Sequence, residues 1–189
     1  MSAVSLTSLW MPILLSAVLV FIASALVHMV LPYHRTDFGK LPSEDQAMDA
    51  LRKFNIPPGD YLMPYSGSPS AMKDPAFLER QKKGPAAIFT VIPSGPWNMG
   101  PQLMQWFLFC VVISVFAAYL TSRADVKPGA PYLEVSRFVS TIAFVGYALG
   151  QWPATIWYKR SAMTSLKGTF DGLLYGFITG GMFGWLWPH

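Results

Sequence analysis

Two long apolar segments without charged side chains constrain the fold more than any other feature of this sequence. Leu9–Leu31 and Leu103–Leu120 contain no Asp, Glu, Lys or Arg. Crossing the hydrocarbon core of a bilayer takes about 20 apolar residues. Phe138–Tyr158 and Phe170–Trp187 are two further apolar segments close to this length. The sequence therefore predicts an all-α membrane protein with four transmembrane helices, at about residues 9–31, 103–121, 138–158 and 170–187.

The charged residues are concentrated between the first and second predicted spans. Residues 35–100 hold eight of the fourteen basic and seven of the ten acidic side chains, whereas residues 1–34 hold none. We expect a single membrane domain, residues 1–189, with a partly helical extramembrane loop at 35–101. The first apolar segment lacks a basic start and is longer than the apolar part of a signal peptide, so we expect it to be retained as a helix.

The basic residues also predict an orientation, because Lys and Arg are favoured in cytoplasmic loops. The first and third connections between spans hold eleven of them and the second holds three. Both termini are therefore expected outside, with the 35–101 loop in the cytoplasm.

The net charge of +4 does not by itself indicate a nucleic-acid partner. The segment 35–100 carries only +1, eight basic minus seven acidic side chains, and the remaining surplus fits membrane orientation. The single cysteine, Cys110, excludes an intramolecular disulfide and leaves no cysteine cluster for a metal. We expect the lipid bilayer and other membrane proteins, or further copies of the chain, as partners. We expect neither nucleic acid nor a cofactor.

Glycine recurs at every fourth residue through the last apolar segment. In a soluble helix each glycine costs about 1 kcal/mol relative to alanine, but in a membrane helix it lets another backbone approach closely. The row predicts a close, right-handed helix pair and leaves open which helix is contacted. The third predicted span has a similar seam of small residues. The predicted packing residues are Gly168, Gly172, Gly176, Gly180, Gly184, Gly150 and Ala143.

Polar side chains near the end of the first span are candidates for a ligand site. Ser24 and His28 are four residues apart and so neighbours on one helix face. His28 either ligates a haem or pigment metal or carries a proton, or it bonds to Ser24 or to a carbonyl near the interface. With no second histidine expected at comparable depth, the structural interpretation is favoured. His34 and Asp37 form either an acid–base pair or, as we prefer, an anchor at the level of the lipid headgroups.

A second set of polar side chains lies in the third span. Pro153 leaves a carbonyl of the preceding turn without its helical donor, which predicts a bend around Gly150–Pro153. Gln151 either satisfies backbone groups there or lines a small polar pocket, and Tyr147 lies one turn before it. Together with Ser114 they define one alternative function, a small-solute channel or transporter.

The 35–101 loop carries two helix signatures. Ser43–Gln46 has the form of a capping box and predicts a helix to about Phe54 with its apolar side chains buried. A second helix is predicted between Asp74, a suitable capping residue, and Gly84, which follows the helix end, with Pro75 in the first turn. The apolar run AAIFTVI that follows predicts a strand-like or re-entrant segment.

The first predicted span is rich in small residues and is followed by an interfacial aromatic residue and the tripeptide Phe38-Gly39-Lys40. The C-terminus of the same chain is rich in Gly and Trp. This pattern resembles uncharacterised families of small four-helix bacterial inner-membrane proteins, from whose compact members the segment 41–101 departs as an insertion. The resemblance implies a multi-pass protein of the bacterial cytoplasmic (inner) membrane and no catalytic residue.

None of the four predicted spans has a central Asp, Glu, Lys or Arg, and motifs for phosphate loops, zinc proteases, serine hydrolases and calcium loops are missing from the sequence. We therefore expect no enzyme. The chain is interpreted as a non-catalytic accessory or scaffold membrane protein that packs against other membrane helices. The alternatives are the solute channel and a haem- or pigment-binding electron-transfer subunit that uses His28.

Overall fold

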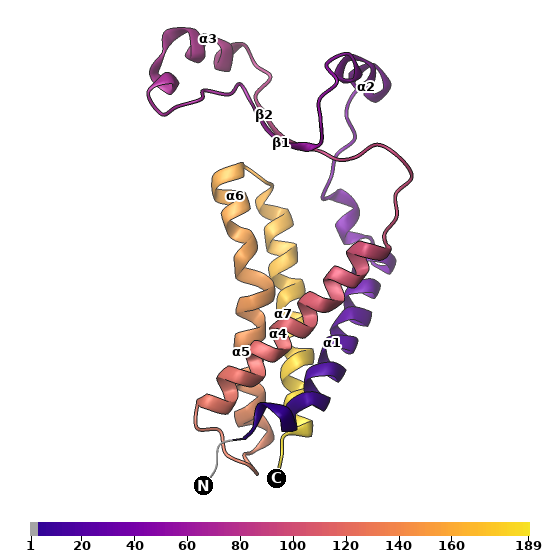
Figure 1. The fold of residues 1–189 in the computed structure, drawn as a ribbon, viewed down its shortest axis with the longest axis vertical. Coiled ribbons are helices and arrows are strands. Elements are labelled where there is room, and N and C mark those ends of the chain that lie inside the picture. Colours follow the sequence, from indigo (N-terminus) through magenta and orange to yellow (C-terminus); the bar gives the residue numbers. More distant parts are fainter. Residues whose placement is uncertain (1–3) are drawn as a thin grey trace. The chain divides into compact units, whose positions relative to one another are not determined.

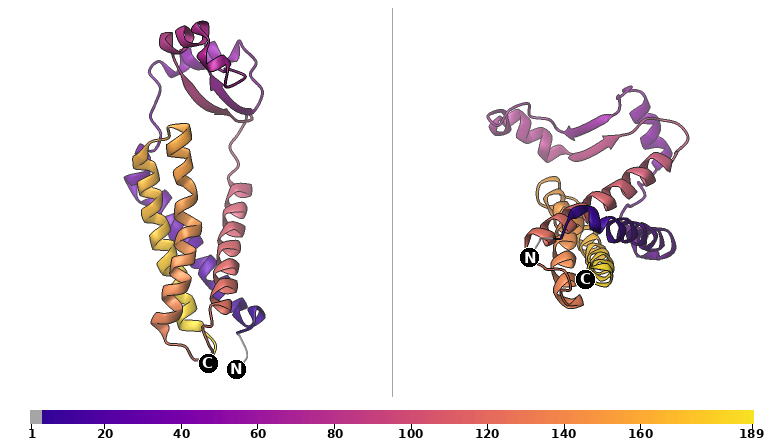
Figure 2. Two further views of the ribbon diagram at one scale, coloured as in Figure 1. Left: turned by 90° about the vertical axis from the view of Figure 1, so that its left-hand side faces the viewer. Right: turned by 60° about the horizontal axis from the view of Figure 1, so that its bottom comes forward.

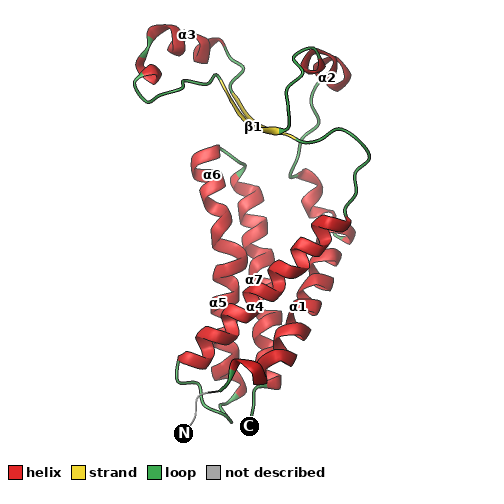
Figure 3. Ribbon diagram, viewed as in Figure 1, coloured by secondary structure: helices red, strands yellow, loops and turns green. Residues whose placement is uncertain are grey.

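The computed structural model describes residues 4–189 and divides the chain into two compact units (Figures 1 and 3). The helical unit comprises the chain up to Phe38 together with Asn98–His189, and the loop unit is Gly39–Trp97. Helix predominates, as expected. Residues 35–38 belong to the helical unit and not to the loop, where the sequence pattern placed them.

The helical unit is built from four long helices that alternate in direction (Figure 1). The first helix is extended at its start by a 3-10 turn, η1 Leu6–Leu9, and at its end by a π-helical turn, η2 Leu26–Val30. A 3-10 turn, η3 Pro32–Thr36, follows directly. The four helices are α1 Trp10–Ala25, α4 Gly100–Arg123, α5 Tyr132–Ala148 and α7 Ala162–Leu186.

Two of these segments, Leu6–Val30 and Gly100–Arg123, are long and apolar enough to cross a membrane. The expected third and fourth spans are helices, but among the described residues they do not pass the same test of length and hydropathy. α5 is too short because its continuous part ends at Ala148. The many glycines of α7 lower its mean hydropathy. α7 also begins at Ala162, earlier than the predicted residue 170.

The helices α1 and α4 pack through small side chains. The hydroxyls of Ser16 and Ser114 lie 3.0 Å apart in the interior, and Ser16 Oγ donates to the Ile13 carbonyl at 3.1 Å. Small side chains along one face of α4 are buried: Cys110, Ser114, Ala117, Ala118 and Thr121.

The glycine row of α7 packs on α5 of the same chain, which lies alongside it (Figure 2). A Cβ added at Gly176 would lie 2.9 Å from the Ser140 carbonyl oxygen and 3.2 Å from the Phe144 amide nitrogen. A methyl group does not fit at such distances from backbone, so glycine is required there. The whole row has partners in α5 and its extension: Gly168 faces Gln151, Gly172 faces Ala148, Gly176 faces Ser140, Gly180 faces Ser136 and Gly184 faces Tyr132.

The interruption expected at Pro153 is confirmed. α5 gives way to a 3-10 turn, η5 Leu149–Gln151, and the chain continues as α6 Trp152–Tyr158 with Pro153 in its first turn. Of the two predicted packing residues in this region, Ala143 is fully buried. Gly150 was wrongly included, because a Cβ added there would meet nothing within 4 Å. It lies in the 3-10 turn, where the helical spacing that suggested its position no longer holds.

One end of the helical unit is closed by the start of α1, the α4–α5 connection and the end of α7. Trp187 Nε1 donates to the Lys127 carbonyl at 3.0 Å, and the Gly129 amide donates to the Pro188 carbonyl at 2.8 Å. Leu9 and Val126 are buried in the same cluster. The polar side chains of interest lie at the opposite end, where η2 and η3 meet the start of α7 (Figure 1).

Large apolar side chains cover the outside of the helical unit, while hydroxyl groups such as Ser114 and Thr179 are buried inside it. This is the distribution that a lipid environment favours, because polar groups then avoid hydrocarbon. Exposed examples come from α1, α4 and α7: Trp10, Ile22, Leu108, Phe116, Phe177 and Trp185.

The loop unit contains two short helices and a two-stranded antiparallel sheet in which Tyr61 pairs with Phe89. The second helix signature is confirmed, since Asp74 accepts a bond from the Ala76 amide at 2.9 Å and Gly84 has a φ of +60°. The strand expected after Ala86 is present, but its partner strand was not predicted. The elements are α2 Glu44–Arg52, β1 Gly59–Met63, η4 Ala71–Lys73, α3 Pro75–Lys83 and β2 Ala87–Val91.

Two expectations for α2 are wrong. Ser43 makes no capping bond: its backbone is left-handed, with a φ of 50°, whereas a capping residue usually has extended dihedral angles. Leu51 and Phe54 are exposed and not buried, since no element of the loop unit covers that side of α2. Phe77 is the single buried side chain of the loop unit.

Candidate functional site

A π-helical turn followed at once by a 3-10 turn reverses the chain at the end of α1. The Leu31 amide bonds the Leu26 carbonyl at 3.2 Å, which is the wider spacing of a π turn. Pro32 then opens η3, where its fixed φ suits the first helical position. The reversal brings His28 of η2 and His34 of η3 together, with stacked rings whose centroids are 4.2 Å apart.

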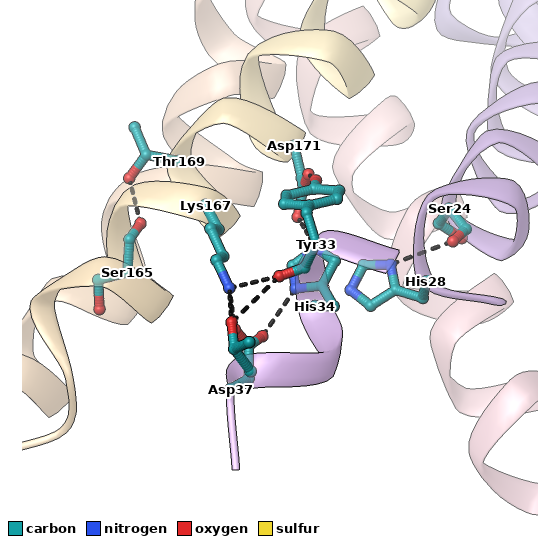
Figure 4. Close-up of polar contacts among 10 residues, drawn as sticks. Ser24, His28, Tyr33, His34, Asp37, Ser165, Lys167, Thr169 and Asp171 are labelled. Atoms are coloured by element: carbon teal, nitrogen blue, oxygen red, sulfur yellow. Dashed lines mark hydrogen bonds and ion pairs between the residues drawn. The ribbon is translucent and has the colours of Figure 1, made fainter. Parts of the chain in front are cut away.

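Helix α7 contributes two charged side chains to this region. Lys167 and Asp171 are four residues apart, so they lie on one face of the helix. Lys167 Nζ donates to Asp37 Oδ1 at 2.9 Å and to Thr36 Oγ1 at 2.8 Å, and it also donates to the Tyr33 carbonyl. The ammonium therefore fastens the start of α7 to η3 (Figure 4).

His34 bridges the two carboxylates. Its Nδ1 lies 2.7 Å from Asp37 Oδ2 and its Nε2 lies 2.9 Å from Asp171 Oδ2. The side chains of His34, Asp37 and Asp171 are 11%, 12% and 4% exposed, respectively. Tyr33 donates its hydroxyl to the other oxygen of Asp171. We call these five residues the polar cluster: Tyr33, His34, Asp37, Lys167 and Asp171.

The charge of Asp37 is stabilised by its neighbours. Burial would raise the pKa of this carboxyl, but the hydrogen bonds from His34 and Lys167 outweigh burial and hold the pKa below its usual range. Asp37 is therefore ionised in the folded protein at neutral pH, paired with the ammonium on one oxygen and with the imidazole on the other.

His28 lies at the edge of the polar cluster. Its Nδ1 is 3.1 Å from the Ser24 carbonyl, four residues earlier in the helix. Ser24 in turn links α1 to α4, because its hydroxyl accepts a bond from Trp106 Nε1 at 2.7 Å. A groove of about 240 Å³ opens beside these residues, and its lining comes from both helices: Phe21, Ser24, Ala25, His28, Met29, Met99, Leu103 and Trp106.

The sequence predicted part of this arrangement. The bond between His28 and a helix carbonyl was one of its two interpretations, and His34 and Asp37 are paired as one interpretation had it. His34 and Asp37 are both largely buried against α7, and their position at the level of the lipid headgroups stays a prediction. One expectation was wrong. A second histidine does lie beside His28, because η2 and η3 fold the chain back on itself.

Tyr33, Lys167 and Asp171 were missed as members of the site. The fourth span was predicted to begin at residue 170, next to Asp171, but α7 begins at Ala162 and so places Asp171 well inside the helix. The available signal was the charged pair Lys167 and Asp171, at helical spacing on the edge of an apolar segment. Such residues seldom enter a membrane helix unless a partner faces them.

Gln151 and Tyr147 lie outside the polar cluster. Gln151 Nε2 donates to the Ala148 carbonyl at 3.0 Å, so it satisfies backbone at the end of α5. Tyr147 packs among aromatic rings that include Trp106 and Tyr175, and its hydroxyl lies 3.5 Å from the Cys110 carbonyl. Ser114, the third residue of the suggested solute path, is bonded to Ser16. Each of the three thus has a different protein partner.

Comparisons of the chain with protein-family models, with curated proteins and with solved structures found no match. The resemblance to small four-helix bacterial membrane proteins therefore stays a prediction.

Proposed function

We propose that the protein is a non-catalytic accessory protein of the bacterial inner membrane, in which four spans hold the loop unit and the loop unit binds a partner protein. The proposal is carried by one observation. The loop unit, residues 39–97, buries a single side chain, Phe77, and exposes many apolar ones. Exposed apolar surface on this scale is typical of a surface that associates with something else.

The exposed side chains are large, and several are aromatic. Phe54 is 72% exposed, Tyr65 71% and Trp97 66%. Aromatic side chains are enriched at protein–protein interfaces, and a few of them commonly provide most of the binding energy. Charged residues such as Lys53 lie among them, which fits the mixed surface of a partner-binding segment.

The helical unit is suited to a supporting role. Its glycine row is occupied by its own α5, so that contact stabilises the unit and is not free for a partner helix. The polar cluster ties η3, which directly precedes the loop unit, to α7. These bonds fix the chain at the point where the loop unit begins.

The test is purification from native membranes in mild detergent, comparing the wild type with Phe54→Ser. We expect one protein to co-purify in fixed ratio with the wild type and to be lost with Phe54→Ser. Lys53→Ser is the matched control, because it changes an exposed neighbour without removing apolar surface, and it should retain the partner. Isolation of the wild type as a monomer without a stoichiometric partner, or unchanged capture by Phe54→Ser, would refute the proposal.

A further inference from the structure

In each of the two neighbouring histidines an acceptor oxygen faces the Nδ1 atom. His28 Nδ1 faces the Ser24 carbonyl at 3.1 Å, and His34 Nδ1 faces Asp37 Oδ2 at 2.7 Å. An acceptor oxygen at Nδ1 places a proton on that nitrogen, which in His28 leaves a lone pair on Nε2. In His34 the Nε2 atom also faces a carboxylate oxygen, Asp171 Oδ2, at 2.9 Å, so a metal ion would take the place of the proton between these two atoms. Metal-ligating histidines are usually fixed in this way, by a backbone carbonyl or a carboxylate on the nitrogen that does not bind the metal.

A carboxylate completes the set. One ligand atom each from His28, His34 and Asp171 lie within 4.8 Å of one another. Asp171 is held by the Tyr33 hydroxyl on one oxygen, which leaves the other oxygen for His34 or for a cation. In a tetrahedral site with ligands at about 2.0–2.1 Å, neighbouring donor atoms are about 3.3 Å apart. The ligand atoms of His28, His34 and Asp171 can therefore reach the spacing of such a site through movements of their side chains alone.

The charges of the region favour a cation. The polar cluster contains two carboxylates, Asp37 and Asp171, and one ammonium, Lys167, which bonds Asp37 directly at 2.9 Å. Lys167 therefore compensates Asp37 and leaves the charge of Asp171 to be balanced by a proton on His34 or by a bound ion. A nearly buried carboxylate without such a counter-charge is unfavourable.

We propose that His28 Nε2, His34 Nε2 and an oxygen of Asp171 bind a divalent transition-metal ion of the zinc class. Two imidazoles and one carboxylate suit zinc and its neighbours better than magnesium or calcium, which prefer oxygen alone. Three protein ligands leave one coordination position open, as in zinc sites that bind a further ligand. The groove lined in part by His28 lies next to the proposed site, and Figure 4 shows His28, His34 and Asp171 together.

Binding requires one ring to move. A metal lies near the plane of each ligating imidazole, whereas the rings of His28 and His34 are stacked with an interplanar angle of 10°. His28 is the ring that turns, because it is exposed and bonded only to a carbonyl of its own helix, whereas His34 is held from both sides. The same stacking leaves no space for a macrocycle between the two rings, so the site does not fit a bis-histidine haem.

The test uses the full chain, purified in detergent without a histidine tag and stripped with a chelator. Titration with Zn²⁺ by calorimetry should show one ion per chain, and Co²⁺ should give visible absorption bands typical of nitrogen and oxygen ligands. His28→Asn should weaken Zn²⁺ binding by more than about 100-fold, since loss of even an outer partner of a metal ligand costs about 10- to 100-fold. His189→Asn, which changes the one histidine outside the pair, should bind as the wild type does.

His28→Asn is the decisive variant because His28 is exposed and bonds a carbonyl of its own helix, so we expect its melting temperature without metal to equal that of the wild type. Zn²⁺ should raise the melting temperature of the wild type and leave that of His28→Asn unchanged, because an ion that binds only the folded state stabilises it. A stripped wild type that takes up no stoichiometric Zn²⁺, or a His28→Asn variant that binds as tightly as the wild type, would overturn the proposal. Binding is measured on the isolated chain, so its outcome is independent of any partner protein.

Discussion

Helix α7 makes two kinds of contact that differ in what they tolerate. Along its glycine row the backbone of α7 lies against α5, with no space for even a methyl group at Gly176. Near its start, Lys167 and Asp171 reach η3 through long polar side chains. The first contact depends on the close fit of two backbones and does not depend on charged groups. The second depends on charge and on hydrogen-bond partners, and it can adapt its shape.

The largest effect should come from adding bulk to the glycine row. Gly176→Leu forces a side chain onto the Ser140 carbonyl and the Phe144 amide, which are backbone atoms and cannot rotate away. Overpacking costs about 1–3 kcal/mol and sometimes more, and we expect more than about 3 kcal/mol here. The measurement is the melting temperature and the yield of monodisperse protein in detergent.

Gly150→Leu is the matched control for the glycine row. A Cβ at Gly150 would meet nothing within 4 Å, so the same substitution should change stability by less than about 1 kcal/mol. Equal tolerance of leucine at both positions would show that close backbone contact is not what holds α7 to α5.

The two contacts were not equally predictable from the sequence. The glycine row is a local pattern with a fixed spacing, so it predicted a close helix contact, although not that α5 would fill it. The polar cluster joins residues 34 and 171 through a π turn and a 3-10 turn, and no periodic pattern signals such turns. The prediction that Gly150 is a packing residue was wrong for the same reason, since the spacing rules for an α-helix do not hold in the 3-10 turn η5.

Removal of the Asp171 charge should have the next largest effect. Asp171→Asn keeps the shape of the side chain but replaces one oxygen with a donor, so either His34 Nε2 or the Tyr33 hydroxyl loses its acceptor. A buried group left without its partner costs about 1–3 kcal/mol, and we expect about 2 kcal/mol. The loss is measured as a shift of the thermal or denaturant midpoint.

Asp125→Asn provides the control for the Asp171 charge. Asp125 is 88% exposed and its nearest cation, Lys127 Nζ, is 3.8 Å away, so its loss should cost less than about 0.5 kcal/mol. If both variants were equally stable, the charge of Asp171 would have no part in holding α7 to η3.

The smallest effect, and the one that separates the two contacts most directly, is the response to acid. Asp37 has a lowered pKa in the folded protein, so its contribution is complete above the unfolded pKa of about 3.9 and is lost as the pH falls through the lower folded pKa. At neutral pH, Asp37→Asn should cost about 1 kcal/mol through the weaker bonds to His34 and Lys167.

Below about pH 4 the wild type and Asp37→Asn should therefore approach the same stability. The measurement is the melting temperature of both proteins between pH 7 and pH 3. Other titratable groups near Asp37 include His28, His34, Lys167 and Asp171. The row from Gly172 to Gly184 contains no carboxyl or histidine. The difference between the wild type and a milder variant, Gly176→Ala, should consequently stay constant over the same range. If that difference also shrank in acid, the two contacts of α7 would form one cooperative unit, and the charge at η3 would be helping to hold the glycine row against α5.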